Sequence, residues 1–133
     1  MSYLLDTNII SELVAEPQGK LAARVAAVGE ANVITSIVVS AELEFGVRKK
    51  GSPELAKKVA NIMRRIYVAP LAPPADESYA AVRFDLERRG RPIGPNDMLI
   101  AAHAIALGAT LVTDNAKEFS RVQGLKVENW LRP

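Results

Sequence analysis

The order of apolar segments along the chain limits its possible folds more than any other feature does. Short apolar runs with the length of β-strands are separated by helix-length segments with apolar residues three and four positions apart. The predicted strands are residues 3–6, 32–35, 66–68, 110–113 and 125–128. Strands that alternate with helices build parallel sheets covered on both faces. The sequence therefore predicts an α/β protein, a three-layer sandwich around a mainly parallel sheet of four to five strands.

Capping residues mark the ends of the predicted helices. Ser36 is a suitable N-cap for a helix that runs to residue 50, and Ser52 followed by Pro53 starts the next one. The apolar side of the helix at 36–50 is predicted to contain Ile37, Val38, Ala41 and Phe45. The predicted helices cover residues 7–15, 17–29, 36–50, 53–65, 76–90, 96–107 and 115–120.

Composition excludes several classes of protein. A length of 133 residues, with 49% hydrophobic and 24% charged residues, is typical of a globular chain, so we expect one domain over residues 1–133. The chain has no cysteine, which excludes disulfide, zinc-thiolate and thiol-nucleophile chemistry. Its only histidine, His103, is expected at the core edge or an interface, and a ribonuclease that uses two histidines is excluded. No segment has the pattern of a signal peptide or membrane span, and we expect a cytoplasmic protein that binds no membrane.

Three acids fall where an α/β fold places its ligands. Asp6 ends the first predicted strand, Asp97 lies in the first turn of a helix, and Glu42 stands among apolar residues within another. Each acid also has a simpler interpretation: Asp6 as a helix cap, Asp97 as a partner of the helix dipole, and Glu42 as a member of a surface ion pair. Gly46, one helical turn after Glu42, leaves space beside that carboxylate.

The charge of these acids indicates a metal ion. Acids that converge on one edge of a sheet repel one another, and a divalent cation relieves the repulsion. Oxygen ligands without histidine or cysteine suit Mg²⁺ or Mn²⁺. Such ions activate water and stabilise the leaving oxygen in phosphodiester hydrolysis, which is therefore the reaction that the acids favour.

The basic residues are unevenly distributed, although the formal net charge is only +2. Between positions 48 and 65 a single acid, Glu54, stands among Arg48, Lys49, Lys50, Lys57, Lys58, Arg64 and Arg65. The solvated face of a helical hairpin explains this run as simply as an anionic partner does.

Four segments carry a family resemblance: LLDTNIISEL, SAELEFGV, GPNDMLIAAHAIALGATLVTDNAKEF and GLKVENW. In this order and spacing they resemble a PIN-domain protein, and more narrowly the VapC-type ribonuclease toxins of toxin–antitoxin pairs. The resemblance covers nearly the whole chain. It implies RNA cleavage at a Mg²⁺-binding acidic cluster, a homodimer, and a cognate antitoxin that blocks the activity.

The resemblance also assigns roles to individual residues. The metal-binding and catalytic acids are then Asp6, Glu42 and Asp97. Hydroxyl positions beside the site are matched by Thr7 and Thr113. From the charge run, the residues expected to contact RNA or the antitoxin are Arg48, Lys49 and Lys50.

The sequence leaves more than one position open for the fourth acid of the site. Related proteins often carry Asp two places after the threonine, where this chain has Asn115, and others use an acid three places further on, here Glu118. Alternation along the strand turns Asp114 away from the side that Thr113 faces. Because Glu118 lies one helical turn beyond Asn115, we predict that Glu118 completes the site, with Asp114 and Asn115 in supporting places. A cap or an ion pair with Arg121 is the alternative role of Glu118.

Other functions fit the sequence less well. A phosphoaspartyl phosphatase needs an acid two places after Asp6, where Asn8 stands, and a receiver-like module needs an acid pair that LLDTN lacks. A non-catalytic RNA-binding PIN domain would lack the acids that are present here. Within the enzyme class, a housekeeping RNA-processing nuclease is the alternative, and a compact chain favours the toxin.

Overall fold

The strands of the computed structural model, which describes residues 1–132, form one parallel sheet. They are β1 (Tyr3–Leu5), β2 (Val33–Ser36), β3 (Tyr67–Ala69), β4 (Thr110–Val112) and β5 (Val127–Glu128). The strands lie in the order β3-β2-β1-β4-β5, and every neighbouring pair is parallel. The predicted α/β class and its sheet are confirmed; Pro133, at the end of the predicted domain, lies outside the described residues.

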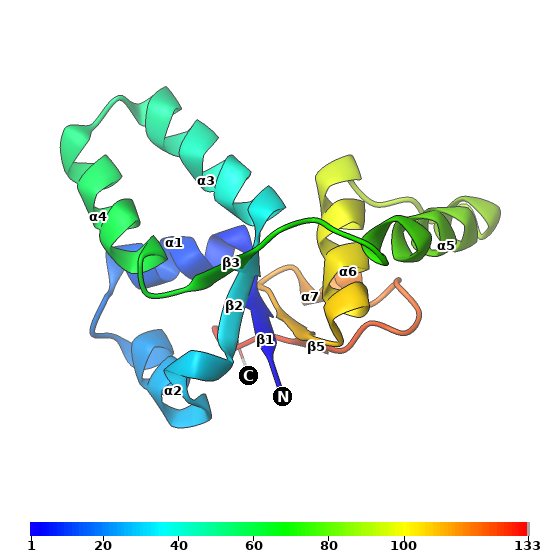
Figure 1. The fold of residues 1–133 in the computed structure, drawn as a ribbon, viewed down its shortest axis with the longest axis horizontal. Helices are drawn as coiled ribbons and strands as arrows, with labels where there is room; N and C mark the ends of the chain where they lie inside the picture. Colours follow the sequence, from blue (N-terminus) through cyan, green and yellow to red (C-terminus); the bar gives the residue numbers. More distant parts are fainter. Residues whose placement is uncertain (133) are drawn as a thin grey trace.

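Helices cover both faces of the sheet, as the three-layer prediction requires (Figure 1). The connections from β1 through β2 to β3 contain α1 (Thr7–Ala15), α2 (Lys20–Val28), the short 3₁₀ helix η1 (Glu30–Asn32), α3 (Ile37–Lys50) and α4 (Pro53–Met63). The connections from β3 through β4 to β5 contain α5 (Ala75–Arg88), α6 (Pro95–Leu107) and α7 (Ala116–Phe119). Within residues 1–132, no helix has the length and apolar character that a membrane crossing requires.

The two groups of helices lie on opposite faces because the chain crosses the sheet in two directions. From β1 the chain adds β2 and β3 toward one edge of the sheet, and it later adds β4 and β5 toward the other edge. Because the crossovers are right-handed, these opposite directions place the helices of the two halves on opposite faces. The strand order reverses between β1 and β4. This switch point is where open α/β sheets bind their ligands.

The predicted helix boundaries agree with the structure within about two residues, with one exception. The helix predicted from Pro17 begins at Lys20, because Gly19 takes an extended backbone as its N-cap. Ser36 and Ser52 cap α3 and α4 through their side chains, as predicted.

The predicted apolar side of α3 is wrong except at Val38, which is half-buried and packs against the core. The residues of α3 that face the core are Val39 and Leu43. The four residues predicted to face inward are half-buried or exposed, and they are Ile37, Val38, Ala41 and Phe45. Phe45 is 66% exposed. Both sets follow helical spacing, so periodicity alone does not distinguish them, and the packing of α3 against α1, α4 and α6 decides which set is buried.

His103 lies inside the core rather than at its edge. It is 1% exposed, and its Nδ1 atom is 2.7 Å from the Ser36 hydroxyl, so it connects α6 to the beginning of α3. Burial lowers the pKa of the imidazole. The only histidine of the chain therefore serves the packing of two helices.

Candidate active site

Asp6 lies where β1 ends and α1 begins, and it serves both elements. Its amide donates a hydrogen bond of 2.9 Å to the Val112 carbonyl of β4. One carboxylate oxygen caps α1 by accepting from the Thr7 amide at 2.8 Å, and the other accepts from the Thr113 hydroxyl at 2.7 Å. Asp6 is only 6% exposed, and its carboxylate is thus both a helix cap and a fixed group at the switch point.

Glu42 is held at the same place by the next residue of α1. The Thr7 hydroxyl donates to Glu42 Oε1 at 2.6 Å, and Asn96 Nδ2 donates to Glu42 Oε2 at 3.5 Å. Across residues 1–132, no lysine or arginine forms an ion pair with Glu42. The interpretation of Glu42 as part of a surface ion pair is therefore wrong.

Asp97 and Glu118 meet between the start of α6 and α7, and their carboxyl groups share a hydrogen bond. Burial raises the pKa of Asp97 to about 7, and the proximity of Glu118, Asp6 and Glu42 contributes to the rise. The hydrogen bond of 2.9 Å from Asn115 Nδ2 instead lowers the pKa of Glu118. Asp97 is therefore the member of the pair that holds a proton.

The pKa of Asp6 responds to the charges of both Glu42 and Glu118. Burial raises this pKa, hydrogen bonds from Thr113 and Thr7 lower it, and the charges of Glu42 and Glu118 raise it further. Four carboxylates from separate segments thus share one electrostatic site. Within residues 1–132, no three of them approach closely enough to form a ready-made metal site.

The donor chemistry of this site fits Mg²⁺ or Mn²⁺. The carboxylate, hydroxyl and side-chain amide groups around Asp6 all carry an oxygen atom. Oxygen is the ligand atom that these ions prefer. Burial is the main cause of the raised pKa of Asp6 and Asp97, and the charges of neighbouring acids add to it. A divalent cation relieves that added repulsion.

Asp114 follows Thr113 but is engaged by the C-terminal segment. Its carboxylate accepts from Asn129 Nδ2 at 3.1 Å and pairs with Arg132 Nε at 3.0 Å. Glu118 is one of the main causes of the raised pKa of both Asp6 and Asp97, and Asp114 is not. The positions of the two acids agree with the alternation expected along the strand, and a catalytic role for Glu118 stays a prediction.

Two asparagines beside the site were not predicted from the sequence. Asn96 donates to Glu42, and Asn8 Oδ1 accepts from the Asp114 amide at 3.2 Å. Their signal is weak, because each stands within two residues of a predicted acid and nothing else distinguishes it. Only the folded chain shows which groups they contact.

The basic residues expected to contact a partner occupy the last turn of α3. Cations at this end of a helix also interact favourably with the helix dipole. All three, Arg48, Lys49 and Lys50, are exposed. Lys50 lines a groove that also contains Thr7 and Glu42. Of the three basic residues, Lys50 therefore shares a groove with Glu42, one of the four acids.

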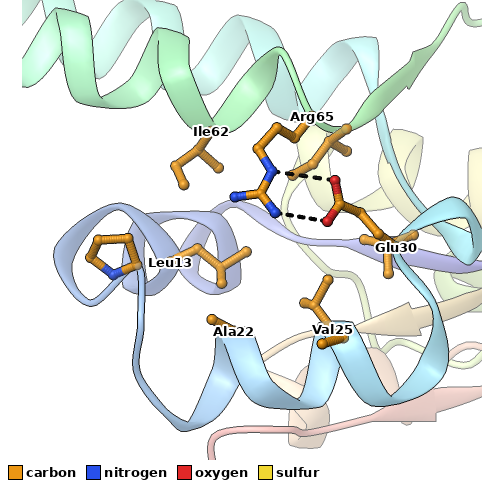
Figure 2. Close-up of a pocket in the computed structure, with 10 residues that line it drawn as sticks. Leu13, Ala22, Val25, Glu30, Ile62 and Arg65 are labelled. Carbon is orange, nitrogen blue, oxygen red and sulfur yellow. Dashed lines mark hydrogen bonds and ion pairs between the residues drawn. The ribbon is translucent and has the colours of Figure 1, made fainter.

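A separate cavity of about 100 Å³ lies away from the acids (Figure 2). Its apolar lining includes Leu13, Ala22, Val25 and Ile62. Beside this cavity, Arg65 donates hydrogen bonds to both carboxylate oxygens of Glu30, at 3.3 and 2.7 Å. Val33, which begins β2, also lines the cavity, so it lies toward the opposite ends of the strands from the acids.

Comparison with known proteins agrees with this arrangement. The PIN domain family model matches residues 3–125. Ribonuclease VapC2 of Rickettsia felis is 38% identical over 132 residues, which is 98% of each chain, and the tRNA(fMet)-specific endonuclease VapC of Shigella flexneri is 34% identical over 131 residues, again 98% of each. The crystal structure of VapBC2 from Rickettsia felis bound to a DNA fragment from their promoter matches with a TM-score of 0.90 at 35% identity, over 98% of this chain and 99% of that chain. The chain therefore belongs to the PIN-domain family and, within it, to the VapC-type proteins.

Proposed function

We propose that this protein is a Mg²⁺-dependent endoribonuclease and the toxin of a toxin–antitoxin pair. The observation that carries the proposal is the single electrostatic site formed by Asp6, Glu42, Asp97 and Glu118 at the switch point of the sheet. The names of the two relatives, a ribonuclease and a tRNA-specific endonuclease, support the class of reaction. Asp6, Glu42 and Asp97 would hold Mg²⁺ or Mn²⁺, and Glu118 would complete the site.

Neighbouring residues hold the acids in place through hydrogen bonds. Bound Mg²⁺ supplies a Lewis acid that lowers the pKa of water and neutralises charge on the phosphate. Thr7 orients both Asp6 and Glu42, Thr113 fixes the second oxygen of Asp6, and Asn115 orients Glu118. Because Asp97 has a pKa of about 7, its proton has to leave before the carboxylate serves as a ligand.

The partners that we propose are RNA, a cognate antitoxin and a second copy of the chain. Phe45 and Ile37 are exposed on α3, which also carries Glu42. Exposed apolar side chains grouped beside a functional site are typical of surfaces that other proteins cover. They support protein partners close to the acids, in the cytoplasm where the RNA substrate is found.

Purified protein, bulk bacterial tRNA and Mg²⁺ test this function directly. We choose tRNA because the Shigella flexneri relative is named for cleaving one. We expect cleavage that stops when a cognate antitoxin, to be sought as a small protein encoded next to this chain, is added. Cleavage that continues at the full rate would instead identify a housekeeping nuclease.

Joint replacement of Arg48, Lys49 and Lys50 by alanine is expected to weaken tRNA binding and its salt dependence. Each lost phosphate contact should reduce the slope of log affinity against log salt by about 0.7 for a single strand. Fluorescence anisotropy with labelled tRNA at several NaCl concentrations measures both quantities. Lys20→Ala/Lys126→Ala, which removes exposed charges elsewhere, is the control and should leave the slope unchanged. An unchanged slope in the triple variant would exclude these residues from RNA binding.

Asp97→Asn is expected to stabilise the metal-free protein at pH 8 but not at pH 4. The pKa of Asp97 is raised from 3.8 to about 7, so its contribution to stability is fully present below 3.8 and is lost as the pH rises through 7. Asparagine does not ionise, and it retains a donor toward Glu118. Urea denaturation in excess chelator at both pH values measures the difference.

Asp76→Asn is the matched control, because Asp76 is an exposed acid in the first turn of α5. It removes a favourable charge from a helix N-terminus and should slightly destabilise the protein at pH 8. If Asp97→Asn has the same effect as Asp76→Asn, Asp97 acts only on the helix dipole.

A further inference from the structure

Arg121, which follows α7 closely, has its guanidinium partly withdrawn from water. The residue is half-buried, and its Nε atom is one of two buried side-chain polar atoms without a hydrogen bond in residues 1–132. Within the same residues, no carboxylate forms an ion pair with Arg121, so its nearby acid Glu118 does not explain its position. Burial of an unpaired N–H group is unfavourable, and this arginine therefore requires another explanation.

Two arginines connect the end of α7 to the turn between α5 and α6. Arg121 donates through Nη1 to the Pro92 carbonyl of this turn at 3.2 Å. Arg89, at the end of α5, donates through Nη2 to the Arg121 carbonyl at 2.5 Å. Asp85 fixes the Arg89 guanidinium, because its Oδ2 atom accepts from Nε at 3.0 Å and from Nη2 at 2.7 Å. We call these four residues, Asp85, Arg89, Pro92 and Arg121, the arginine clamp.

The turn that the arginine clamp holds also provides a contact of Glu118. Two residues after Pro92, the Gly94 amide donates to Glu118 Oε1 at 3.4 Å, while Asn115 Nδ2 donates to the other oxygen at 2.9 Å. Gly94 is the N-cap of α6, and Asp97 in the first turn of α6 shares a hydrogen bond with Glu118. Because 3.4 Å is long for a hydrogen bond, a small shift of the turn would break the Gly94 contact and move the two acids apart.

The donors of Arg121 point into the protein rather than toward a ligand. Its Nε atom is buried, and its Nη1 atom is engaged by the Pro92 carbonyl. An arginine that binds the phosphates of RNA instead presents its planar set of donors to the solvent. The geometry therefore favours an internal role over direct contact with a substrate.

We propose that Arg121 is a positioning residue, which clamps the turn at 89–94 to α7 and so keeps Glu118 beside Asp97. Arg89 assists by fixing the backbone of Arg121. The inference rests on the proposed ribonuclease function for its effect on cleavage, whereas the arginine clamp itself can be measured without RNA or metal.

Arg121→Met tests the proposal, because methionine keeps an unbranched side chain but has no donor. We expect kcat for bulk tRNA with Mg²⁺ to fall by about tenfold with KM little changed, the effect of losing a group that supports a site. Amide hydrogen exchange of residues 89–94 in the metal-free protein should become faster, because the turn opens more readily. Arg89→Met removes the other half of the arginine clamp and should change both quantities in the same direction.

Arg83→Met is the matched control. Arg83 is exposed on the same helix as Arg89, and it donates to Glu87 at 2.8 Å without contacting the turn. It should change neither kcat nor the exchange rates. A second comparison uses Glu118→Gln as the starting protein, in which Arg121→Met should lower kcat by less than about twofold, because its effect passes through Glu118.

Each other outcome has a distinct meaning. A raised KM with unchanged kcat would show that Arg121 contacts RNA, and it would overturn the proposal. A full loss of kcat in the Glu118→Gln protein would show that Arg121 acts by another route, and it would also overturn the proposal. If Arg121→Met does not fold, the same measurements on Arg89→Met decide. If the wild-type protein cleaves no tRNA, the proposed function fails, and hydrogen exchange alone decides: unchanged exchange of residues 89–94 would overturn the arginine clamp.

Discussion

Asp6→Asn is expected to remove RNA cleavage while the protein stays folded. Replacing a residue that only orients a metal ligand typically lowers affinity or activity by about 10–100-fold, and removing a ligand itself should cost more. The asparagine oxygen still accepts from the Thr7 amide, so the cap of α1 survives. The lost Thr113 hydrogen bond is offset by the removal of a carboxylate whose pKa burial has raised.

Cleavage of bulk tRNA, circular dichroism melting and growth inhibition on expression measure this result. Asp114→Asn is the matched control, because Asp114 follows β4 closely, much as Asp6 follows β1, but contacts the C-terminal segment. We expect the control to cleave RNA. If Asp6→Asn cleaves RNA at the wild-type rate, Asp6 is a helix cap and nothing more.

Glu118→Gln is expected to lower Mn²⁺ affinity and turnover by about 10–100-fold, the range for groups that support a metal site. Glu118 accepts from Asn115 and from the Gly94 amide at 3.4 Å, and it shares a hydrogen bond with Asp97. Glutamine keeps the size of the side chain but removes the charge that acts on Asp6 and Asp97.

Asp114→Asn, measured in the same assays, decides which residue is the fourth acid. Its carboxylate is already engaged by Asn129 and Arg132, so we expect a small loss of stability and near-normal turnover. If Asp114→Asn is the more damaging change in both assays, with folding unchanged, Asp114 is the fourth acid and Glu118 is not.

The position of Asp6 was predictable because two general rules combine there. An apolar run that ends in a carboxylate indicates a strand end, and α/β sheets gather ligands at such ends. The neighbourhood of β1 and β4 follows from the strand order of this class of fold, and it brings Thr113 to Asp6. These parts of the site depend on topology, which the pattern of strands and helices largely determines.

The orientation of α3 was not predictable from the same kind of pattern. Its apolar residues form more than one stripe, and Phe45 belongs to the one that stays exposed. The contact between Thr7 and Glu42 joins residues 35 positions apart, and the contact between His103 and Ser36 joins residues 67 apart. Such pairs arise from the packing of whole helices and strands, so the local sequence around each residue does not predict them.

The empty space beside Gly46 lies between these two cases. The sequence indicates that a glycine one turn after Glu42 leaves room on that side of α3. Only the packing of α1 and α4 against α3 makes that room a groove leading to Lys50.

Cleavage of bulk tRNA by the wild-type protein at controlled metal concentration tests the central claim most directly. The protein is first stripped of metal with chelator, and Mg²⁺ or Mn²⁺ is then titrated back while fragments are quantified. We predict no cleavage in excess chelator, recovery with either ion, and no recovery in Asp6→Asn at the same concentrations. Full cleavage by the wild-type protein in excess chelator would contradict the assignment of the four acids to a metal-dependent nuclease site.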